Sequence, residues 1–504
     1  MAATEKGLLR LQNGSDVRGV AVAGVADEPV NLTPEAVCRI AMGFIDFLEK
    51  KTGRPASDMK VTIGRDSRVS GPELKKAAIG GLTSRGARVI DCGLASTPAM
   101  FMTTVFDEIK ADGAIMLTAS HLPYNRNGMK FFTKDGGAEK SDVKRILEAA
   151  ACHMADHGNT SDVEKYDLIT RYSAFLREKV SEGLKKSPEE KPLSGMHVVV
   201  DAGNGNGGFF ATKVLEPLGA DISGSVYLEP DGMFPNHIPN PENKQAMASI
   251  KNAVLSSHAD LGLIFDTDVD RMGAVLSSGE ELSRNSLIAM IAAIIAPEYP
   301  GSTIVTDSVT SDELTVFLEH ALGFKHLRYK RGYRNVIDKC IELNHKGETS
   351  PLAIETSGHG ALKENFYLDD GAYLAVKILI AAAKARIAGM NIGALIGKLG
   401  HPAESREYRM TISGVDDVQA YGARVLDTYR SRAAKKGISA AEPSYEGVRL
   451  VFPNGWALLR MSLHDPVMPL NIESKEQGGC ATIAKEIRGF LSGLDALDIG
   501  VLGK

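Results

Sequence analysis

Short apolar runs alternate with longer amphipathic stretches along most of the chain, and this alternation most restricts the possible folds. The apolar runs, each rich in β-branched or aliphatic residues, include 61–63, 114–117, 198–200, 261–265 and 303–305. The amphipathic stretches, with apolar residues three or four positions apart, include 33–51, 72–85, 141–155, 311–322 and 371–387. Because strands alternate with helices, we expect α/β layers with largely parallel pairing.

Three polar, proline-containing segments divide this pattern into units. They are Lys185–Ser194, Pro297–Ser302 and Gly400–Glu407, and beyond the third the pattern becomes shorter and mixed. At about 150 residues per domain, a chain of 504 residues holds about three domains, and two or four are also reasonable. We therefore expect three similar α/β domains at 1–190, 191–300 and 301–405, and a smaller α+β domain at 406–504.

Charge and cysteine content exclude several classes of protein. The formal net charge of −5 provides no global basic field for nucleic acid. The five cysteines are far apart and form no C-x-x-C pair, so we expect neither a disulfide framework nor a zinc site. The longest apolar run, Leu287–Ala296, is too short to span a bilayer, and the opening MAATEKGLLR has no apolar signal core. We therefore expect no nucleic-acid partner and no membrane partner.

Three apolar strands run directly into polar loops, at 115–121, 263–271 and 352–359. Ligand sites in α/β sheets lie where the strands end. We therefore expect these three loops to meet in one cleft.

The middle loop carries three carboxylates at alternate positions, Asp266, Asp268 and Asp270, followed by Arg271. Placed straight after a buried strand, they repel one another unless a cation lies among them. Oxygen-only ligation suits a hard ion such as Mg²⁺, completed by phosphate oxygens. The glycine and the distant glutamate of an EF-hand are missing at the required offsets. The alternative is a solvated acidic turn with Arg271 as a surface partner.

The first loop places Ser120 at a strand end among small residues, where a large substrate can reach it. His121 beside it and Lys130 downstream can handle protons or anionic charge. The G-x-S-x-G elbow is missing, which disfavours a hydrolase triad. The alternative is that Ser120 is only a turn or N-cap serine.

The third loop carries Glu355, Ser357 and His359, whose donors and acceptors suit sugar hydroxyls; the alternative is a polar turn. Near the C-terminus, the run from Gly455 predicts a strand that delivers Arg460 and Ser462 to one spot. Both side chains can hold a phosphate.

The segment Gly203–Gly208 formally matches G-x-G-x-x-G after an apolar strand, with Glu229 near the position of a ribose-binding acid. Asp201 and Ala202 lengthen the turn between strand and glycines, so turn glycines are the default interpretation. The alternative, an NAD-dependent oxidoreductase, predicts a bound nicotinamide cofactor.

In combination these motifs resemble the α-D-phosphohexomutase family, which includes the phosphoglucomutases, phosphomannomutases and phosphoglucosamine mutases. The resemblance covers nearly the whole chain, in order. The similar segments are Asn13–Gly19 (family G-T-D-G-I-R-G), Ile63–Arg68 (G-R-D-x-R), Thr118–His121 (T-A-S-H-x-P), Asp266–Arg271 (D-x-D-x-D-R), Arg331–Arg334 (V-G-x-K/R) and Glu355–His359 (E-x-S-G-H). The amino-acid sequences of these loops are most similar to those of a plastid-type plant or algal branch of the family.

The resemblance implies four domains around a central cleft and Mg²⁺ as the cofactor. It implies a phosphohexomutase that interconverts the 1-phosphate and 6-phosphate of glucose or mannose through a phosphoserine and a bisphosphate intermediate. Its partners would then be hexose phosphates and hexose 1,6-bisphosphate, and the chain would be a monomer or a homodimer. We expect it in the cytoplasm, or in the plastid stroma if a transit peptide has been removed.

The same resemblance assigns roles to individual residues. Ser120 would hold the phosphoryl group and join Asp266, Asp268 and Asp270 as a metal ligand. Proton transfer and charge stabilisation would fall to Lys130, Arg271 and His121. The substrate-binding residues would be Arg18 and Arg65 on the phosphoserine side, Glu355, Ser357, His359 and Arg334 at the sugar, and Arg460 and Ser462 at a phosphate.

The chain departs from the family in two places. The family's C-terminal loop, R-x-S-x-T-E-P followed by a second Arg, is here Arg460-Met-Ser-Leu-His-Asp-Pro466, and Pro469 stands where that Arg would be. Ile354 replaces the glycine before the sugar-loop glutamate. We expect a weaker or differently shaped grip on the distal phosphate. This leaves two alternatives open: a glucose 1,6-bisphosphate synthase using the same phosphoserine, and a non-catalytic sugar-phosphate binding protein.

Overall fold

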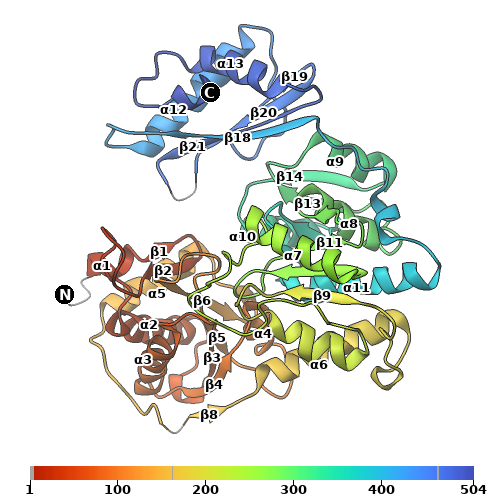
Figure 1. The fold of residues 1–504 in the computed structure, drawn as a ribbon. Helices are drawn as coiled ribbons and strands as arrows, with labels where there is room; N and C mark the ends of the chain where they lie inside the picture. Colours follow the sequence, from red (N-terminus) through yellow and green to blue (C-terminus); the bar gives the residue numbers. More distant parts are fainter. Residues whose placement is uncertain (1–4, 162, 463–464, 504) are drawn as a thin grey trace. The chain divides into compact units, whose positions relative to one another are not determined.

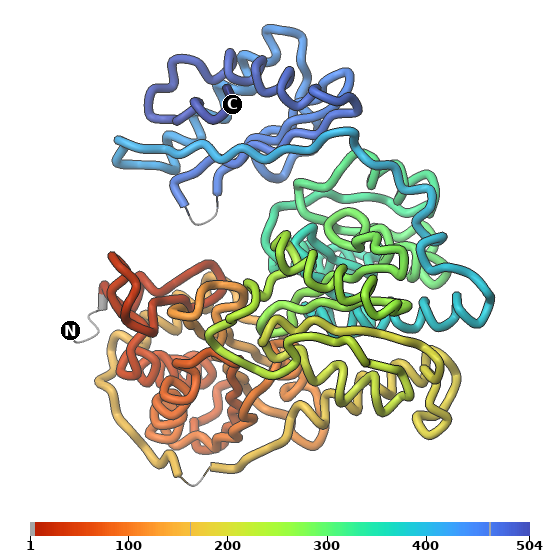
Figure 2. The backbone as a smooth tube through the Cα atoms, in the orientation of Figure 1, coloured from red at the N-terminus to blue at the C-terminus, as the bar shows by residue number. Residues whose placement is uncertain are grey.

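The computed structural model describes residues 5–161, 163–462 and 465–503, and the chain folds into two compact units (Figure 1). The first unit runs to Ile294 and also contains Ser357–Leu395. The second contains Ile295–Thr356 and the chain from Ile396 onward. The chain therefore passes twice from the first unit to the second, a path that Figure 2 lets the reader follow. The domain boundaries expected at 190, 300 and 405 stay a prediction.

The first sheet of the first unit has the strand order β1-β2-β6-β5-β3-β4-β8, with β7 paired to β6. Strands β3, β4, β5 and β8 are parallel, whereas β1, β2 and β6 join antiparallel. The strands are β1 Gln12–Asn13, β2 Asp16–Val20, β3 Lys60–Arg65, β4 Arg88–Leu94, β5 Gly113–Leu117, β6 Arg126–Thr133, β7 Gly136–Gly137 and β8 Glu164–Lys165. The helices are α1 Glu5–Leu9, α2 Pro34–Thr52, α3 Gly71–Ser84, α4 Thr97–Met102, α5 Lys140–Ala151 and α6 Leu168–Leu184.

The second sheet of this unit has the order β12-β11-β10-β9, in which β9 and β10 are parallel and β10 and β11 antiparallel. Its strands are β9 Val198–Asp201, β10 Leu261–Phe265, β11 Met272–Leu276 and β12 Glu281–Leu282, with helices α7 Lys244–Ser257 and α8 Asn285–Ile295. The hairpin β16 Gly360–Leu362 and β17 Leu368–Asp369 leads into α11 Gly371–Ile387. Because β10 is buried along its whole length, Asp266 follows directly from the core.

The second unit contains a parallel set of strands ordered β14-β13-β15 and an antiparallel sheet ordered β18-β21-β20-β19. The first set consists of β13 Thr303–Asp307, β14 Lys325–Tyr329 and β15 Leu352–Ile354, with α9 Asp312–Val316 and α10 Tyr333–His345. The second consists of β18 Glu404–Thr411, β19 Val448–Phe452, β20 Gly455–Leu459 and β21 Val467–Ser474, with α12 Val418–Ala434 and α13 Gly479–Leu491. Short 3₁₀ or π-helical segments lie at Ala56–Asp58, Pro188–Glu190, Phe210–Leu215, Glu216–Leu218, Phe317–Ala321, Lys363–Asn365, Ile392–Ile396 and Gly500–Gly503.

The predicted α/β class with a further sheet-containing C-terminal region is confirmed, and each quoted apolar run lies in a strand. Two helix predictions were too long. The helix expected to end at Ala155 ends at Ala151, where Cys152 caps it. The helix expected over 311–322 is α-helical only to Val316 and continues as a π-helical turn.

Among the described helices, none combines the length and the apolarity needed to cross a membrane. Each of the five cysteines lies within the described residues and is a free thiol.

Glycines allow helices of the first unit to pack closely. Helix α2 contacts both α3 and α5. A Cβ atom on Gly81 of α3 would lie 2.3 Å from the carbonyl oxygen of Cys38 on α2, and one on Gly43 of α2 would lie 2.4 Å from the carbonyl oxygen of Ile146 on α5. Backbone atoms cannot move aside cheaply, so these positions require glycine.

We expect Gly81→Ala to destabilise α2 and α3 by about 1–3 kcal/mol through overpacking. Gly489→Ala in α13 is the matched control, because its Cβ would meet no atom within 4 Å among the described residues. There, alanine's higher helix propensity should stabilise the helix by about 0.5–1 kcal/mol. Native-state amide hydrogen exchange in each helix measures both effects. Equal effects at the two positions would contradict the close-packing argument.

Candidate functional site

Ser120 lies just beyond the end of β5, in a backbone conformation that side chains rarely adopt. Its φ is +50°, in the left-handed region that residues other than glycine rarely adopt, and the residue is 8% exposed. Its N–H donates to Thr118 Oγ1 at 2.9 Å, and the carbonyl oxygen of Thr118 accepts a hydrogen bond from the guanidinium of Arg18. Backbone strain of this kind persists only where the surroundings enforce it, and it concentrates at functional sites.

Asp266, Asp268 and Asp270 follow β10 and are fully buried. One carboxylate oxygen of each lies within 4.8 Å of those of the other two. Oδ1 of Asp268 and Oδ1 of Asp270 are buried and have no hydrogen-bond partner among the described residues. Buried acceptors without partners are costly, and oxygen atoms so grouped are what a hard cation binds. The three side chains therefore fit a divalent metal ion.

The pKa of Asp266 also indicates that negative charge in this cluster is unfavourable without a cation. Burial, together with the neighbouring charge of Asp270, raises it well above its ordinary value. In the absence of a cation, the cluster thus favours taking up a proton rather than holding three negative charges. A bound cation would reverse this preference.

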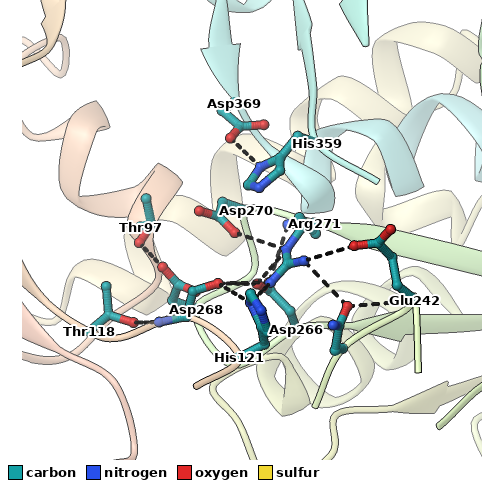
Figure 3. A network of polar contacts seen from close by, with 12 residues as sticks. Thr97, Thr118, His121, Glu242, Asp266, Asp268, Asp270, Arg271, His359 and Asp369 are labelled. Atoms are coloured by element: carbon teal, nitrogen blue, oxygen red, sulfur yellow. Dashed lines mark hydrogen bonds and ion pairs between the residues drawn. The ribbon is translucent and has the colours of Figure 1, made fainter. Parts of the chain in front are cut away.

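Arg271 joins Asp266 to Ser120. Figure 3 shows its guanidinium beside the aspartates. Its Nε donates to Asp266 Oδ2 at 3.0 Å, and its Nη2 donates to Ser120 Oγ at 2.9 Å. The hydroxyl of Ser120 in turn donates to Asp266 Oδ2 at 3.1 Å. On its far side the guanidinium reaches Asn240 Oδ1 at 3.3 Å and lies 3.9 Å from Glu242. The serine oxygen thus touches a carboxylate and a guanidinium at once.

Lys130 supplies a second buried cation. It lies on β6, is 4% exposed, and its Nζ is 2.6 Å from Asp270 Oδ2 and 3.9 Å from Asp268 Oδ2. Burial acts to raise the pKa of Asp270, but Lys130, His359 and Arg271 outweigh it and hold that pKa well below its usual range. Asp270 therefore stays ionised beside the lysine.

The two histidines of the predicted site have opposite charge states. Burial and the Arg271 charge lower the pKa of His121 to about 2, so neutral His121 accepts from the Arg271 guanidinium through Nδ1. Burial also acts to lower the pKa of His359, but Asp369 and Asp270 raise it to about 9. His359 Nδ1 lies 2.5 Å from Asp369 Oδ2, and Figure 3 shows this pair beside Asp270. Asp369 is a partner that our sequence reasoning missed.

Arg18 lies beside the serine loop, and Arg65 ends the strand next to β5. Arg18 pairs with Asp16 at 2.7 Å while holding the carbonyl of Thr118. Arg65 ends β3 and donates to the carbonyl oxygen of Asp66 at 2.9 Å.

Arg68, a residue of the Ile63–Arg68 segment to which the sequence assigned no role, organises the serine loop. It is fully buried and pairs with Asp66 at 3.1 Å. Its guanidinium donates to the carbonyl oxygens of Ser120, Leu122, Pro123 and Arg126. The spacing of Asp66 and Arg68 at the end of a strand was the available signal.

Thr97 and Asn206 fix the aspartate loop. Thr97 donates to Asp268 through its hydroxyl, at 2.5 Å, and through its backbone N–H, at 2.8 Å. The backbone N–H of Asn206 donates to the carbonyl of Thr267 at 2.8 Å, and its side-chain amide donates to the carbonyls of Arg65 and Ala95. Asn206 lies in the glycine segment 203–208, where a Cβ on Gly205 would be 2.7 Å from Thr267 Cα. The glycines thus permit a close backbone contact, as the default interpretation held.

The remaining predicted residues are divided between the units. Ser357 belongs to the first, and its buried Oγ has no hydrogen-bond partner in residues 5–161, 163–462 and 465–503. Glu355, Arg334, Arg460 and Ser462 belong to the second unit. Glu355 accepts the N–H of Gly332 at 2.7 Å, Arg334 pairs with Asp338 at 2.7 Å, and Ser462 Oγ accepts the N–H of Asp465 at 3.3 Å. His464, in the Arg460–Pro466 loop that differs from the family motif, lies outside the described residues.

Models of three domain families match the chain. They are the phosphoglucomutase/phosphomannomutase alpha/beta/alpha domains I, II and III, at residues 10–155, 171–279 and 283–398. A phosphoglucomutase/phosphomannomutase of Thermococcus kodakarensis is 32% identical over 462 residues, 90% of this chain and 94% of the relative. A phosphomannomutase/phosphoglucomutase of Pseudomonas aeruginosa is 29% identical over 437 residues, 86% and 88% of the two chains. The crystal structure of a phosphoglucomutase/phosphomannomutase family protein from Burkholderia thailandensis covers 98% of both chains, at a TM-score of 0.78 and 25% identity.

The aspartate cluster predicts that divalent cations stabilise the protein. At a Mg²⁺ or Mn²⁺ concentration 100 times the Kd, binding should add about 2.7 kcal/mol to the free energy of unfolding. Asp268→Asn should lose most of this gain, and without metal it should unfold no earlier than the wild type because one buried charge is gone. Thermal unfolding with and without the metal measures both effects. Asp107→Asn, at an exposed position, is the control. Equal stabilisation of Asp268→Asn and wild type by the metal would contradict a site at these carboxylates.

Proposed function

The chain belongs to the phosphoglucomutase/phosphomannomutase family and is a phosphohexomutase, and from this premise we propose its reaction in detail. It interconverts the 1-phosphate and the 6-phosphate of glucose or mannose. The reaction proceeds through a phosphorylated Ser120 and a hexose 1,6-bisphosphate, with Mg²⁺ as the cofactor. The observation that carries the proposal is the position of Ser120 Oγ, 3.1 Å from the Asp266 carboxylate and 2.9 Å from the Arg271 guanidinium.

The charges around Ser120 suit a phosphoserine. Such a group carries about −1.5 to −2 charges at pH 7. Arg271 already contacts the serine oxygen, and Lys130 lies on the other side of the aspartates. Mg²⁺, held by Asp266, Asp268 and Asp270, would neutralise negative charge on the phosphoryl oxygens when bound. Phosphoryl transfer needs positioning and charge neutralisation more than covalent chemistry, and these residues provide both.

In the first transfer, the bond between phosphorus and Ser120 Oγ breaks as a bond forms between phosphorus and a sugar hydroxyl oxygen. We assign Lys130 to relay the hydroxyl proton to the released Ser120 oxygen: its ammonium gives up a proton while the sugar hydroxyl supplies another. Asp270, 2.6 Å away, stabilises this ammonium. Arg271 Nη2 donates to the serine oxygen as negative charge develops on it.

The second transfer is the reverse reaction at the other end of the sugar. The bisphosphate turns over, its other phosphate returns to Ser120, and the proton returns to the sugar oxygen that is released. Ser120 is 8% exposed and the three aspartates are fully buried, which limits the access of water that would hydrolyse the phosphoserine.

One departure supports a second candidate, the glucose 1,6-bisphosphate synthase. Pro469 lies on β21, an inner strand of its sheet, where the family has an arginine. A chain with fewer cations for the distal phosphate would release the bisphosphate more readily. The second transfer, in which the other phosphate returns to Ser120, would then be inefficient.

Replacing the serine tests the proposal directly. Intact-protein mass spectrometry with site mapping should find a phosphate on Ser120 that is lost when glucose 1-phosphate is added. Ser120→Ala should carry no phosphate and lose at least about a thousandfold in kcat. Ser278→Ala, at an exposed turn serine, is the control and should retain both. Activity in Ser120→Ala at the wild-type rate would overturn the proposal.

The ratio of products separates the mutase from the synthase. A mutase returns the second phosphate to Ser120, so free bisphosphate should stay below the enzyme concentration while glucose 6-phosphate accumulates. Quantifying both products by ion-exchange chromatography after incubation with glucose 1-phosphate makes the comparison. Bisphosphate in excess over isomerised monophosphate, formed with a phosphoryl donor present, would instead favour the synthase.

A further inference from the structure

One irregular segment, residues 231–242, lies against two of the arginines that contact the serine loop. Its residues form no helix and no strand. The centre of the Phe234 ring lies 5.2 Å from the guanidinium carbon of Arg68, which ties down the serine loop. Further along, Asn240 Oδ1 accepts from Nη1 of Arg271 at 3.3 Å. We call residues 231–242 the brace.

The brace is anchored at two further points. His237 is 5% exposed, and its Nε2 lies 3.0 Å from both carboxylate oxygens of Asp201, a fully buried residue at the end of β9. A Cβ atom on Gly232 would lie 2.4 Å from the carbonyl oxygen of Ser67, so the two backbones are in close contact there. An irregular segment that is held at several points keeps the geometry of the side chains it carries.

The turn that starts α7 aims the amide oxygen of Asn240. This oxygen also accepts the backbone N–H of Glu242, at 3.0 Å, which is the hydrogen bond of an Asx turn. The carbonyl oxygen of Asn240 accepts the N–H of Asn243 at 2.8 Å, and Asn243 is the N-cap of α7. Pro239 and Pro241 on either side restrict the backbone further. Asn240 thus presents a fixed acceptor to the guanidinium.

The Arg271 guanidinium is held at three nitrogen atoms. Its Nε donates to Asp266, its Nη2 to Ser120 Oγ and its Nη1 to Asn240. Because the group is planar, fixing Nη1 also fixes the direction in which Nη2 donates. Figure 3 shows Glu242 beside this guanidinium, and its Oε2 lies 3.9 Å from Nη1. Without the Asn240 oxygen, the Glu242 charge would draw Nη1 and turn Nη2 away from the serine.

We propose that Asn240 is a positioning residue for phosphoryl transfer: it keeps the Arg271 guanidinium aimed at the Ser120 oxygen, and the brace keeps Asn240 in place. This rests on the proposed function, in which Arg271 Nη2 donates to the serine oxygen as negative charge develops there. That hydrogen bond is stronger in the transition state than in the ground state, because its acceptor then carries charge. Loss of its alignment should therefore lower kcat and leave KM nearly unchanged.

Steady-state kinetics with glucose 1-phosphate test the proposal. Asn240→Ala should lower kcat about ten- to a hundredfold, with KM within about twofold of wild type. Asn240→Asp keeps the acceptor oxygen and the turn, so its kcat should stay within about threefold of wild type. If Asn240→Ala does not fold, Asn240→Gly replaces it, because glycine tolerates the turn.

Asn344→Ala is the matched control. It removes a side-chain amide that donates to the carbonyl oxygens of Cys340 and Ser350 in the second unit. It should lower the melting temperature without lowering kcat.

A double-mutant cycle separates positioning from a purely structural role. If Asn240 acts through Arg271, Asn240→Ala should change kcat less than about twofold in an Arg271→Lys background, where Nη1 is absent. A structural role would lower kcat by the same factor in both backgrounds. That additivity, a wild-type kcat in Asn240→Ala, or an equal loss of kcat in Asn240→Asp overturns the proposal.

A readout without turnover keeps this proposal apart from the proposed function. In full-length protein labelled with ¹⁵N-arginine, the Nε–H resonance of Arg271 is identified by its loss in Arg271→Lys. Asn240→Ala should shift or broaden this resonance, whereas Asn344→Ala should not. If it shifts but the wild-type chain does not isomerise hexose phosphates, the mutase fails and the positioning stands. If the chain isomerises them while Asn240→Ala keeps the wild-type resonance and kcat, the positioning fails and the mutase stands.

Discussion

Three carboxylates buried on one short turn must be neutralised, and the first unit is arranged around that requirement. Arg271 and Lys130 bind the outer aspartates, and the oxygen atoms left without partners suit a divalent cation. Ser120 lies against this cluster rather than apart from it. Because the aspartates follow a fully buried strand, their positions are set by the sheet and not by solvent. A preorganised set of opposite charges is what a phosphoryl group requires of its binding site.

The groups that hold this arrangement come from distant parts of the chain. Arg68 ties the serine loop down through four carbonyl oxygens. Thr97 fixes Asp268, and Asn206 ties the aspartate loop to the ends of neighbouring segments. Each of these contacts bridges residues far apart in sequence, so geometry at the serine depends on how the sheets pack. The strained φ of Ser120 is the local sign of that tertiary constraint.

The sequence was informative where the chemistry lies in consecutive residues. The strands, the family and the three polar loops were predictable, because a buried strand followed by acids or small polar residues is a local pattern. The partners were not: nothing near His359 marks Asp369, and nothing near Asp268 marks Thr97. Helix ends were also missed. Helix α5 stops at Ala151, and α9 becomes π-helical after Val316, because the spacing of apolar residues locates a helix but does not fix its ends.

The double passage of the chain has a consequence for synthesis. The first unit is complete only when residues 357–395 have joined it, and those residues carry His359 and Asp369. On the ribosome, the serine and aspartate loops therefore emerge long before the histidine that lies beside them. The first unit must therefore stay incomplete, without residues 357–395, while residues 295–356 are synthesised. The histidine side of the site is thus the last part of this unit to assemble during translation.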